Sequence, residues 1–153
     1  MIDMTRKPLL FPLLGLVALI AHTAHAADPD DMVKYRRNVM SANGGLMGAC
    51  NALIQNKVEF KGAVGNTVAG YARALETLNK DLPALFPKGG NGADSDAQPD
   101  VWSKRAEFEH RARDTQAKAA AFARAASGGD PRLAEKFKEL SDSCKSCHKD
   151  FRK

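Results

Sequence analysis

The chain has 153 residues, 44% of them hydrophobic and 27% charged, with a formal net charge of +5. This length suits one compact domain with a single core, and the ordinary apolar content excludes a disordered chain. The basic residues are spread along the chain without an arginine-rich arm, which argues against a nucleic-acid-binding protein.

The N-terminal segment has the pattern of a secretory signal peptide. Two basic residues precede an uncharged stretch over residues 8–21, and Ala24 and Ala26 follow it with the spacing of a cleavage site. The stretch is too short for an ordinary membrane span. We therefore expect a signal peptide over residues 1–26, cleaved after Ala26. The mature protein should be periplasmic, with a single domain over residues 27–153 and no membrane span.

Four later segments have the hydrophobic periodicity of helices. They cover residues 30–56, 64–82, 101–126 and 130 to the C-terminus, and the last three carry a stripe at alternating spacings of four and three. Short connections should make each of the two helix pairs antiparallel. The longer connection over residues 83–99 can run along the bundle. The sequence thus predicts an all-α fold, an antiparallel four-helix bundle with up-down-up-down topology.

Local signals predict where these helices begin and end. Pro83 prevents the second helix from continuing, and Gly128 and Gly129 close the third. Asp130 is expected to cap the fourth helix, with Pro131 at its first position. The fourth helix then carries its apolar stripe, which includes two cysteines, toward the core.

The strongest motif lies near the end of the fourth predicted helix. Cys144-Lys145-Ser146-Cys147-His148 has the spacing of covalent haem c attachment, in which two thioethers hold the porphyrin and the imidazole binds iron. Cysteines three residues apart lie on one helix face, about 5 Å apart along the axis, so both reach one side of the ring. We therefore predict one covalently bound haem c, attached at Cys144 and Cys147, with His148 as an axial iron ligand.

Three other interpretations of the cysteines are a redox dithiol, half of a zinc site and a structural disulfide. A redox dithiol normally lies at a helix N-terminus, where the helix dipole lowers the thiol pKa, whereas Cys144 and Cys147 lie near a helix end. A zinc ion would need a fourth ligand, and the mature chain offers only Cys50 and His110. A dithiol or metal-storage bundle without haem stays as our third hypothesis. The first two hypotheses both include haem and are described below.

The whole predicted mature chain resembles the cytochrome c′ family, the class II c-type cytochromes. The specific part of the resemblance is the segment over residues 144–152. Residues 35–40, 82–87 and 99–102 support it. The resemblance implies a four-helix bundle with covalently attached haem c, and it also implies a homodimer.

The resemblance implies roles for single residues as well. His148 would be the proximal ligand, and Met40 would lie over the distal face of the iron. Arg36 and Arg37 would contact the haem propionates, although Arg37 stands where the family often has glutamine. Arg152 would tune the proximal imidazole.

The expected bundle geometry supports Met40 as the distal residue. The first and last helices run antiparallel, so the start of one lies beside the end of the other. Met40 lies roughly 15 Å from its helix start and His148 roughly 8 Å from the chain end, which places them at similar heights. Met47 would lie about 10 Å further along, too far to share the iron. Gly44, one turn beyond Met40, can admit a flat ring or a close partner helix.

Two haem functions follow from the two states of Met40. Met40 as a sixth ligand gives a low-spin electron-transfer protein, which is our first hypothesis. An unligated Met40 gives a five-coordinate, high-spin cytochrome c′ that binds nitric oxide or carbon monoxide. The partner is accordingly a redox protein or a small gas. No group of residues resembles an enzyme active site, so we expect no enzymatic activity.

Three further residues have a structural and a functional interpretation. Cys50 is expected to be a small buried hydrophobe, and the alternative is a free thiol that joins two subunits. His110 lies between stripe positions and should point to solvent. Trp102 should pack in the core or at the haem crevice.

Overall fold

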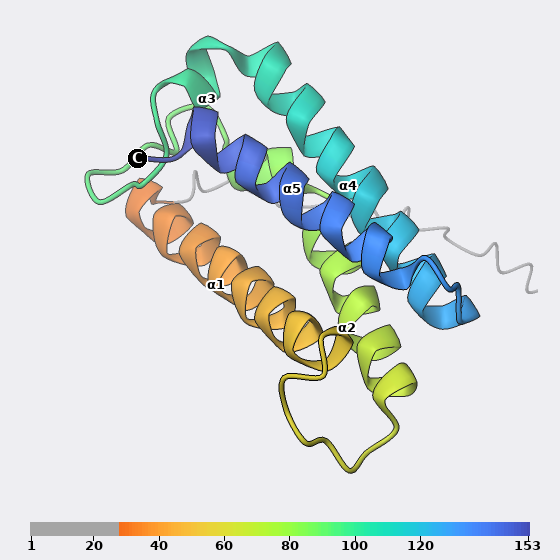
Figure 1. The fold of residues 1–153 in the computed structure, drawn as a ribbon. Helices are drawn as coiled ribbons and strands as arrows, with labels where there is room; N and C mark the ends of the chain where they lie inside the picture. The colour runs from red at the N-terminus through yellow and green to blue at the C-terminus, as the bar shows by residue number, and fades with distance from the viewer. Residues whose placement is uncertain (1–27) are drawn as a thin grey trace, which may run out of the picture.

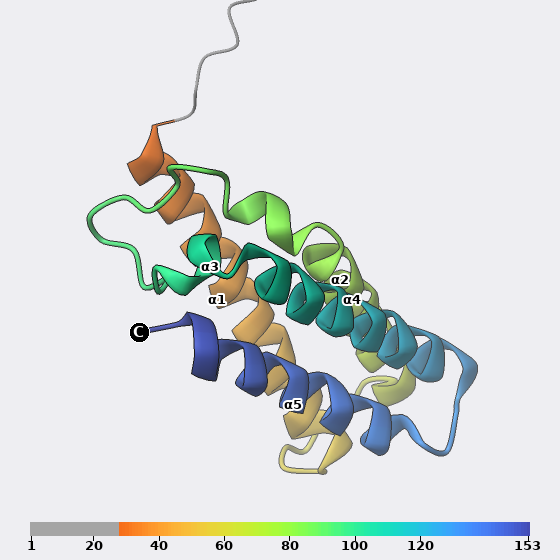
Figure 2. The same cartoon turned by 90° about the horizontal axis from the view of Figure 1, so that it is seen from above.

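The fold is a bundle of four long helices (Figure 1). The structure is a computed structural model that describes residues 28–153, so the predicted signal peptide and its cleavage after Ala26 lie outside the described residues. Successive long helices run in opposite directions in both views (Figures 1 and 2), which confirms the predicted all-α, up-down-up-down bundle. The helices are α1 (Pro29–Ile54), α2 (Val64–Asn79), a short 3-10 helix (Leu82–Leu85), α3 (Asp100–Ser103), α4 (Arg105–Gly128) and α5 (Leu133–Phe151).

None of the helices over residues 28–153 combines the length and the apolar character that crossing a membrane requires.

The second and third helices differ from the sequence prediction at one end each. The second was expected to reach residue 82, but α2 ends at Asn79, and Pro83 lies in the 3-10 helix instead. The third was expected to be continuous from residue 101. A single turn, α3, is followed by a break at Lys104, whose φ of −108° and ψ of 44° leave the helical range, and α4 begins after it.

The start of the fourth helix and the first connection also differ in detail. Gly129 ends α4 with a left-handed φ of 66°, as its position after the last apolar residue predicts. Asp130 accepts a hydrogen bond from the Arg132 backbone N–H (2.8 Å), but α5 itself begins only at Leu133. The connection between α1 and α2 spans residues 55–63 and is longer than the short turn expected there.

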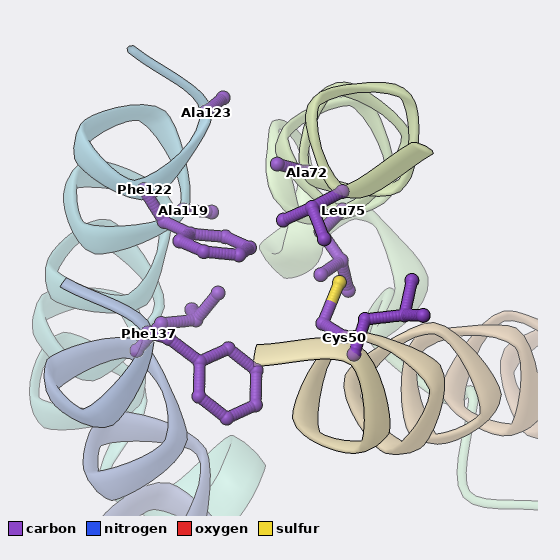
Figure 3. Packing of buried hydrophobic residues seen from close by; sticks show 10 residues of the cluster. Cys50, Ala72, Leu75, Ala119, Phe122, Ala123 and Phe137 are labelled. Atoms are coloured by element: carbon purple, nitrogen blue, oxygen red, sulfur yellow. The ribbon is translucent and has the colours of Figure 1, made fainter. Parts of the chain in front are cut away.

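Two groups of buried apolar side chains form the core. The far cluster lies where α1 ends and α5 begins and takes residues from all four long helices (Figure 3): Cys50, Leu53, Val68, Ala72, Leu75, Ala119, Phe122, Ala123, Phe137 and Leu140. The pocket cluster lies at the other end of the bundle and includes the 3-10 helix: Val39, Leu82, Leu85, Phe86, Val101, Phe108, Ala112 and Phe151. Aromatic rings pack edge-to-face within the pocket cluster, with 4.8 Å between the ring centroids of Phe86 and Phe108.

The boundary between the two clusters crosses all four long helices. It falls between residues 40 and 46 of α1, residues 75 and 78 of α2, residues 112 and 119 of α4, and residues 144 and 147 of α5. The two cysteines of the haem motif therefore lie on opposite sides of the boundary, one packed on each cluster.

The connection over residues 86–99 ties the start of α1 to the C-terminus (Figure 1). Arg36 of α1 donates from Nη2 to Ser95 Oγ at 2.7 Å, and Lys153 donates from Nζ to the Ser95 carbonyl oxygen at 2.9 Å. The start of α1 and the end of α5 therefore lie at the same end of the bundle, as the antiparallel arrangement predicts.

Candidate functional site

A cavity of about 440 Å³ opens between α1 and α5, where residues of both core clusters meet. This volume is in the range of cofactor and small-molecule sites. α1 packs on α2 and α5 packs on α4, whereas α1 and α5 make few direct contacts with each other. The lining includes Met40, Gly44 and Met47 from α1, and Cys144, Cys147 and His148 from α5.

The α5 wall presents the haem motif, and α4 supports it from behind. Arg111 of α4 donates from Nη1 to Ser146 Oγ at 2.5 Å and from Nη2 to Asp150 Oδ2 at 3.1 Å. These two hydrogen bonds hold the turn of α5 that lies between and after the two cysteines. Cys144 and Cys147 are both half-buried and line the cavity, which confirms that both face inward.

The thiols lack the properties of a redox dithiol. Burial, and secondarily the neighbouring Cys144, raises the pKa of Cys147 to about 11, and burial also raises the pKa of Cys144. A reactive dithiol requires the opposite shift, toward the thiolate. All three cysteines over residues 28–153 are free, and that part of the chain contains no group of three side chains with metal-ligating spacing. The geometry therefore disfavours the dithiol, disulfide and zinc interpretations.

His148 is held so that its imidazole stays neutral. Desolvation by burial, followed by the nearby Arg152 cation, lowers the pKa of His148 below its ordinary value. The neutral ring is the form that binds a metal. The Arg152 backbone N–H also donates to the His148 carbonyl oxygen at 3.0 Å and ends α5. Arg152 thus lies close enough to the imidazole to lower its pKa, and its tuning of an iron-bound His148 stays a prediction.

The α1 wall presents two methionines to the cavity. Met40 packs on the pocket cluster and Met47 on the far cluster, and both are half-buried. Met47 was expected to lie too far along the helix to share the iron with Met40; the cavity extends along α1 and is lined by both side chains. A Cβ added at Gly44, between them, would meet nothing within 4 Å, so this wall has room for a flat group.

Arg36 and Arg37 hold the connection over residues 86–99. The buried Arg36 guanidinium donates from Nη1 to the carbonyl oxygens of Leu85 (3.1 Å) and Gly90 (3.0 Å). Its Nη2 donates to Ser95 Oγ, as described above. Arg37 donates to the Asp94 carbonyl oxygen at 2.6 Å. Both arginines also line the cavity, and their contact with haem propionates stays a prediction. The structural role of Arg36 was not predicted from the sequence, although its helical spacing with Val33 could have indicated it.

Three residues outside the motif lie as expected. Cys50 is fully buried in the far cluster, and His110 is exposed on α4. Trp102 packs on the pocket cluster and donates from Nε1 to the Pro87 carbonyl oxygen at 2.8 Å. Three polar residues that line the cavity were not predicted as site residues: Asn43, Asn79 and Thr115.

The composition of the cavity fits haem c. Two inward cysteines and a neutral histidine on one wall are the groups that attach the ring and bind its iron. The apolar residues of the two clusters provide the surroundings that a porphyrin requires. The open space over Gly44 leaves the opposite face of the site accessible.

Comparison with known proteins agrees with this fit. The sequence matches the Cytochrome C' family over residues 31–152. Cytochrome c' from Rhodospirillum rubrum is 35% identical over 141 residues, which cover 90% of this chain and 93% of that protein.

Solved structures show the same similarity. A nitric oxide complex of a variant of cytochrome c prime from Alcaligenes xylosoxidans has a TM-score of 0.75 at 28% identity, covering 84% of this chain and 98% of that one. A carbon monoxide complex of another variant of that cytochrome has a TM-score of 0.74 at 28% identity, covering 83% and 98%. The chain therefore belongs to the cytochrome c′ family, whose members carry one covalently bound haem c.

Proposed function

We propose that the protein holds haem c through Cys144, Cys147 and His148 and binds nitric oxide or carbon monoxide at a five-coordinate, high-spin iron. The observation that carries the proposal is the cavity between α1 and α5, with the attachment motif on one wall and Met40 on the other. Variants of the similar cytochrome from Alcaligenes xylosoxidans form complexes with both gases. They favour gas binding over our first hypothesis, electron transfer with Met40 as a sixth ligand.

On the proximal side, the chain keeps one imidazole ready to bind iron. Burial and the Arg152 cation lower the pKa of His148, so the ring is neutral at neutral pH and has a free nitrogen lone pair. The hydrogen bonds from Arg111 hold the motif on α5, so that the cysteines and the imidazole keep their relative positions. A bound haem iron supplies an open coordination position for a diatomic ligand.

On the distal side, Met40 acts as a steric gate. Its side chain packs on the pocket cluster and lines the cavity, which holds it at the cavity wall. A ligand that approaches from α1 has to displace this side chain, because protein interiors leave little free space around such groups. Gly44, one turn further along, leaves room into which Met40 can move.

The proposal extends to the cellular setting and to the assembly. We propose that the signal peptide over residues 1–26 directs export to the periplasm, and that the mature chain functions there as a single domain, as a homodimer, without enzymatic activity. A diffusing gas, rather than a protein, is then the principal partner of the iron.

Replacing Met40 tests the gate directly. In haem-loaded protein, Met40→Ala should raise the carbon monoxide association rate about tenfold. The substitution removes the steric overlap between the entering ligand and the Met40 side chain, and lowering the association barrier by about 1.4 kcal/mol increases the rate by that factor. Stopped-flow mixing of the ferrous protein with carbon monoxide measures the rate. Met47→Ala is the matched control and should have a much smaller effect, since Met47 packs on the far cluster.

The same variant separates the two haem hypotheses. If Met40 is a gate, the spectrum of Met40→Ala stays high-spin like that of the wild-type protein, and only the rate changes. A low-spin wild-type spectrum that becomes high-spin in Met40→Ala would show that Met40 is a ligand and would overturn the proposal.

A further inference from the structure

The cavity contains an asparagine pair that haem attachment does not use. Asn43 lies on α1 three residues after Met40, and Asn79 is the last residue of α2. Both line the cavity, and Asn79 is only 4% exposed. An asparagine is rarely buried to this degree unless its amide group has partners.

Hydrogen bonds fix the orientation of both amides. Asn79 donates from Nδ2 to Asn43 Oδ1 at 2.6 Å and to the Leu75 carbonyl oxygen at 2.7 Å. Asn43 donates from Nδ2 to the Val39 carbonyl oxygen at 3.1 Å. An amide nitrogen carries two hydrogens, so both donors of Asn79 are used and one donor of Asn43 is left. Asn79 therefore holds the Asn43 amide from α2 and leaves it able to donate once more.

A second polar group lines the same cavity from α4. Thr115 is 3% exposed, and its hydroxyl makes no hydrogen bond within residues 28–153. No fully enclosed side-chain oxygen in that part of the chain lacks a partner, so the Thr115 hydroxyl must be open to the cavity. Two residues that can donate a hydrogen bond, one on α1 and one on α4, thus line a cavity that is otherwise mostly apolar.

We propose that Asn43 donates a hydrogen bond to the outer atom of a diatomic ligand on the iron, that Asn79 positions it, and that Thr115 is a second polar contact. This inference rests on the proposed function and deepens it. Distal hydrogen-bond donors decide which ligand a haem pocket favours. A donor stabilises nitric oxide, which accepts electron density from the iron, more than carbon monoxide. The pocket is therefore selective for nitric oxide.

The competing explanation is that the pair only ties α1 to α2. In haem-loaded ferrous protein, Asn43→Leu should lower the ratio of nitric oxide to carbon monoxide affinity by less than about fivefold, because fivefold is the effect of one whole hydrogen bond and the carbon monoxide complex loses a weaker one. The C–O stretching frequency of the carbon monoxide complex should rise, because the donor no longer withdraws electron density through the ligand oxygen. A control variant, Asn51→Leu, lies on α1 outside the cavity and should change neither quantity.

Asn79→Leu tests the positioning role. It leaves the donor of Asn43 in place but removes the group that orients it, so the C–O frequency should shift in the same direction by a smaller amount. A broader C–O band should accompany the shift, since the Asn43 amide then takes several orientations. Unfolding in urea, measured on each variant, gives the loss of stability separately.

The outcomes distinguish this inference from the proposed function. If the wild-type protein binds both gases and Asn43→Leu loses stability without any change in C–O frequency or affinity ratio, the pair is a structural tie and the inference is wrong. If the wild-type ferrous protein binds neither gas, both the inference and the proposed function are wrong. If the C–O stretching frequency shifts in Asn43→Leu and does not shift in Asn51→Leu, both the inference and the proposed function are supported.

Discussion

The far cluster is built from apolar side chains of all four long helices, whereas the pocket cluster depends on the connection between α2 and α4. In the far cluster the helices pack directly on one another, with Phe122 and Leu75 fully buried (Figure 3). In the pocket cluster the 3-10 helix and α3 supply several of the buried residues. Polar ties from Arg36 and Arg105 to backbone carbonyls hold that connection in place.

This contrast shows how one bundle combines a stable end with a reactive one. The far cluster stabilises the fold by burial alone and needs no cofactor. The pocket cluster leaves space between α1 and α5 and replaces direct helix contact by hydrogen bonds from buried side chains. Substitutions in the far cluster should therefore change stability alone, while substitutions around the cavity should also change the haem.

Removing a large side chain from the far cluster should have the largest effect on stability. Phe122→Ala should lower the free energy of unfolding by about 3–5 kcal/mol, because Phe122 is fully buried against Phe137 and its loss leaves a cavity. Urea unfolding measures the loss. The exposed Phe60→Ala is the control and should change little. A shifted haem spectrum in folded Phe122→Ala would break the distinction between the two ends.

Removing the buried cation at the pocket end should have the next largest effect. Arg36→Met should lower the free energy of unfolding by about 3 kcal/mol, because three oxygens lose a charged donor at once. The exposed Arg37→Met loses a single hydrogen bond and should cost about 1 kcal/mol. Unlike the far-cluster variant, Arg36→Met should also alter gas binding rates. Equal losses in the two arginine variants would contradict this account of the connection.

The smallest expected effect is an alkaline loss of stability at the far cluster. Burial raises the pKa of Cys50 from 9.0 to about 11, so between these values the unfolded chain releases a proton that the folded chain keeps. The free energy of unfolding should then fall as the pH rises through this window, by up to about 1.4 kcal/mol per pH unit. Below pH 9 the contribution is fully present.

Unfolding of the haem-loaded protein at several pH values measures this slope. Cys144 and Cys147 are thioethers in that form and do not titrate, so Cys50→Ala should flatten the slope between pH 9 and 11. A slope that persists unchanged in Cys50→Ala would assign the alkaline loss to other groups.

The helical part of the fold could be predicted because its information is local. A stripe with spacings of three and four fixes both the helix and its buried face, and it placed Phe108, Phe122, Phe137 and Leu140 in the core. The haem motif could be predicted for the same reason, since its cysteines share that stripe. The break at Lys104 could not be predicted, because it depends on how α3 meets the pocket cluster.

The polar parts of the site depend on contacts between distant segments. Arg36 was assigned to the haem propionates by resemblance, yet its hydrogen bonds join residues 49 to 59 positions away in the chain. Asn79 was not predicted as a site residue, because only the folded structure brings it within 2.6 Å of Asn43. Sequence patterns show which residues face the core, but not which polar groups meet there.

The central claim is that His148 is the one side chain of the protein that binds the iron, and that Met40 covers the other side of the iron without binding it. The absorption spectrum of the purified, haem-loaded protein, oxidised and reduced, tests it most directly. We predict a high-spin spectrum in both states, no methionine-to-iron charge-transfer band, and a shift when nitric oxide is added. A low-spin spectrum with that charge-transfer band would contradict the claim and establish Met40 as a ligand.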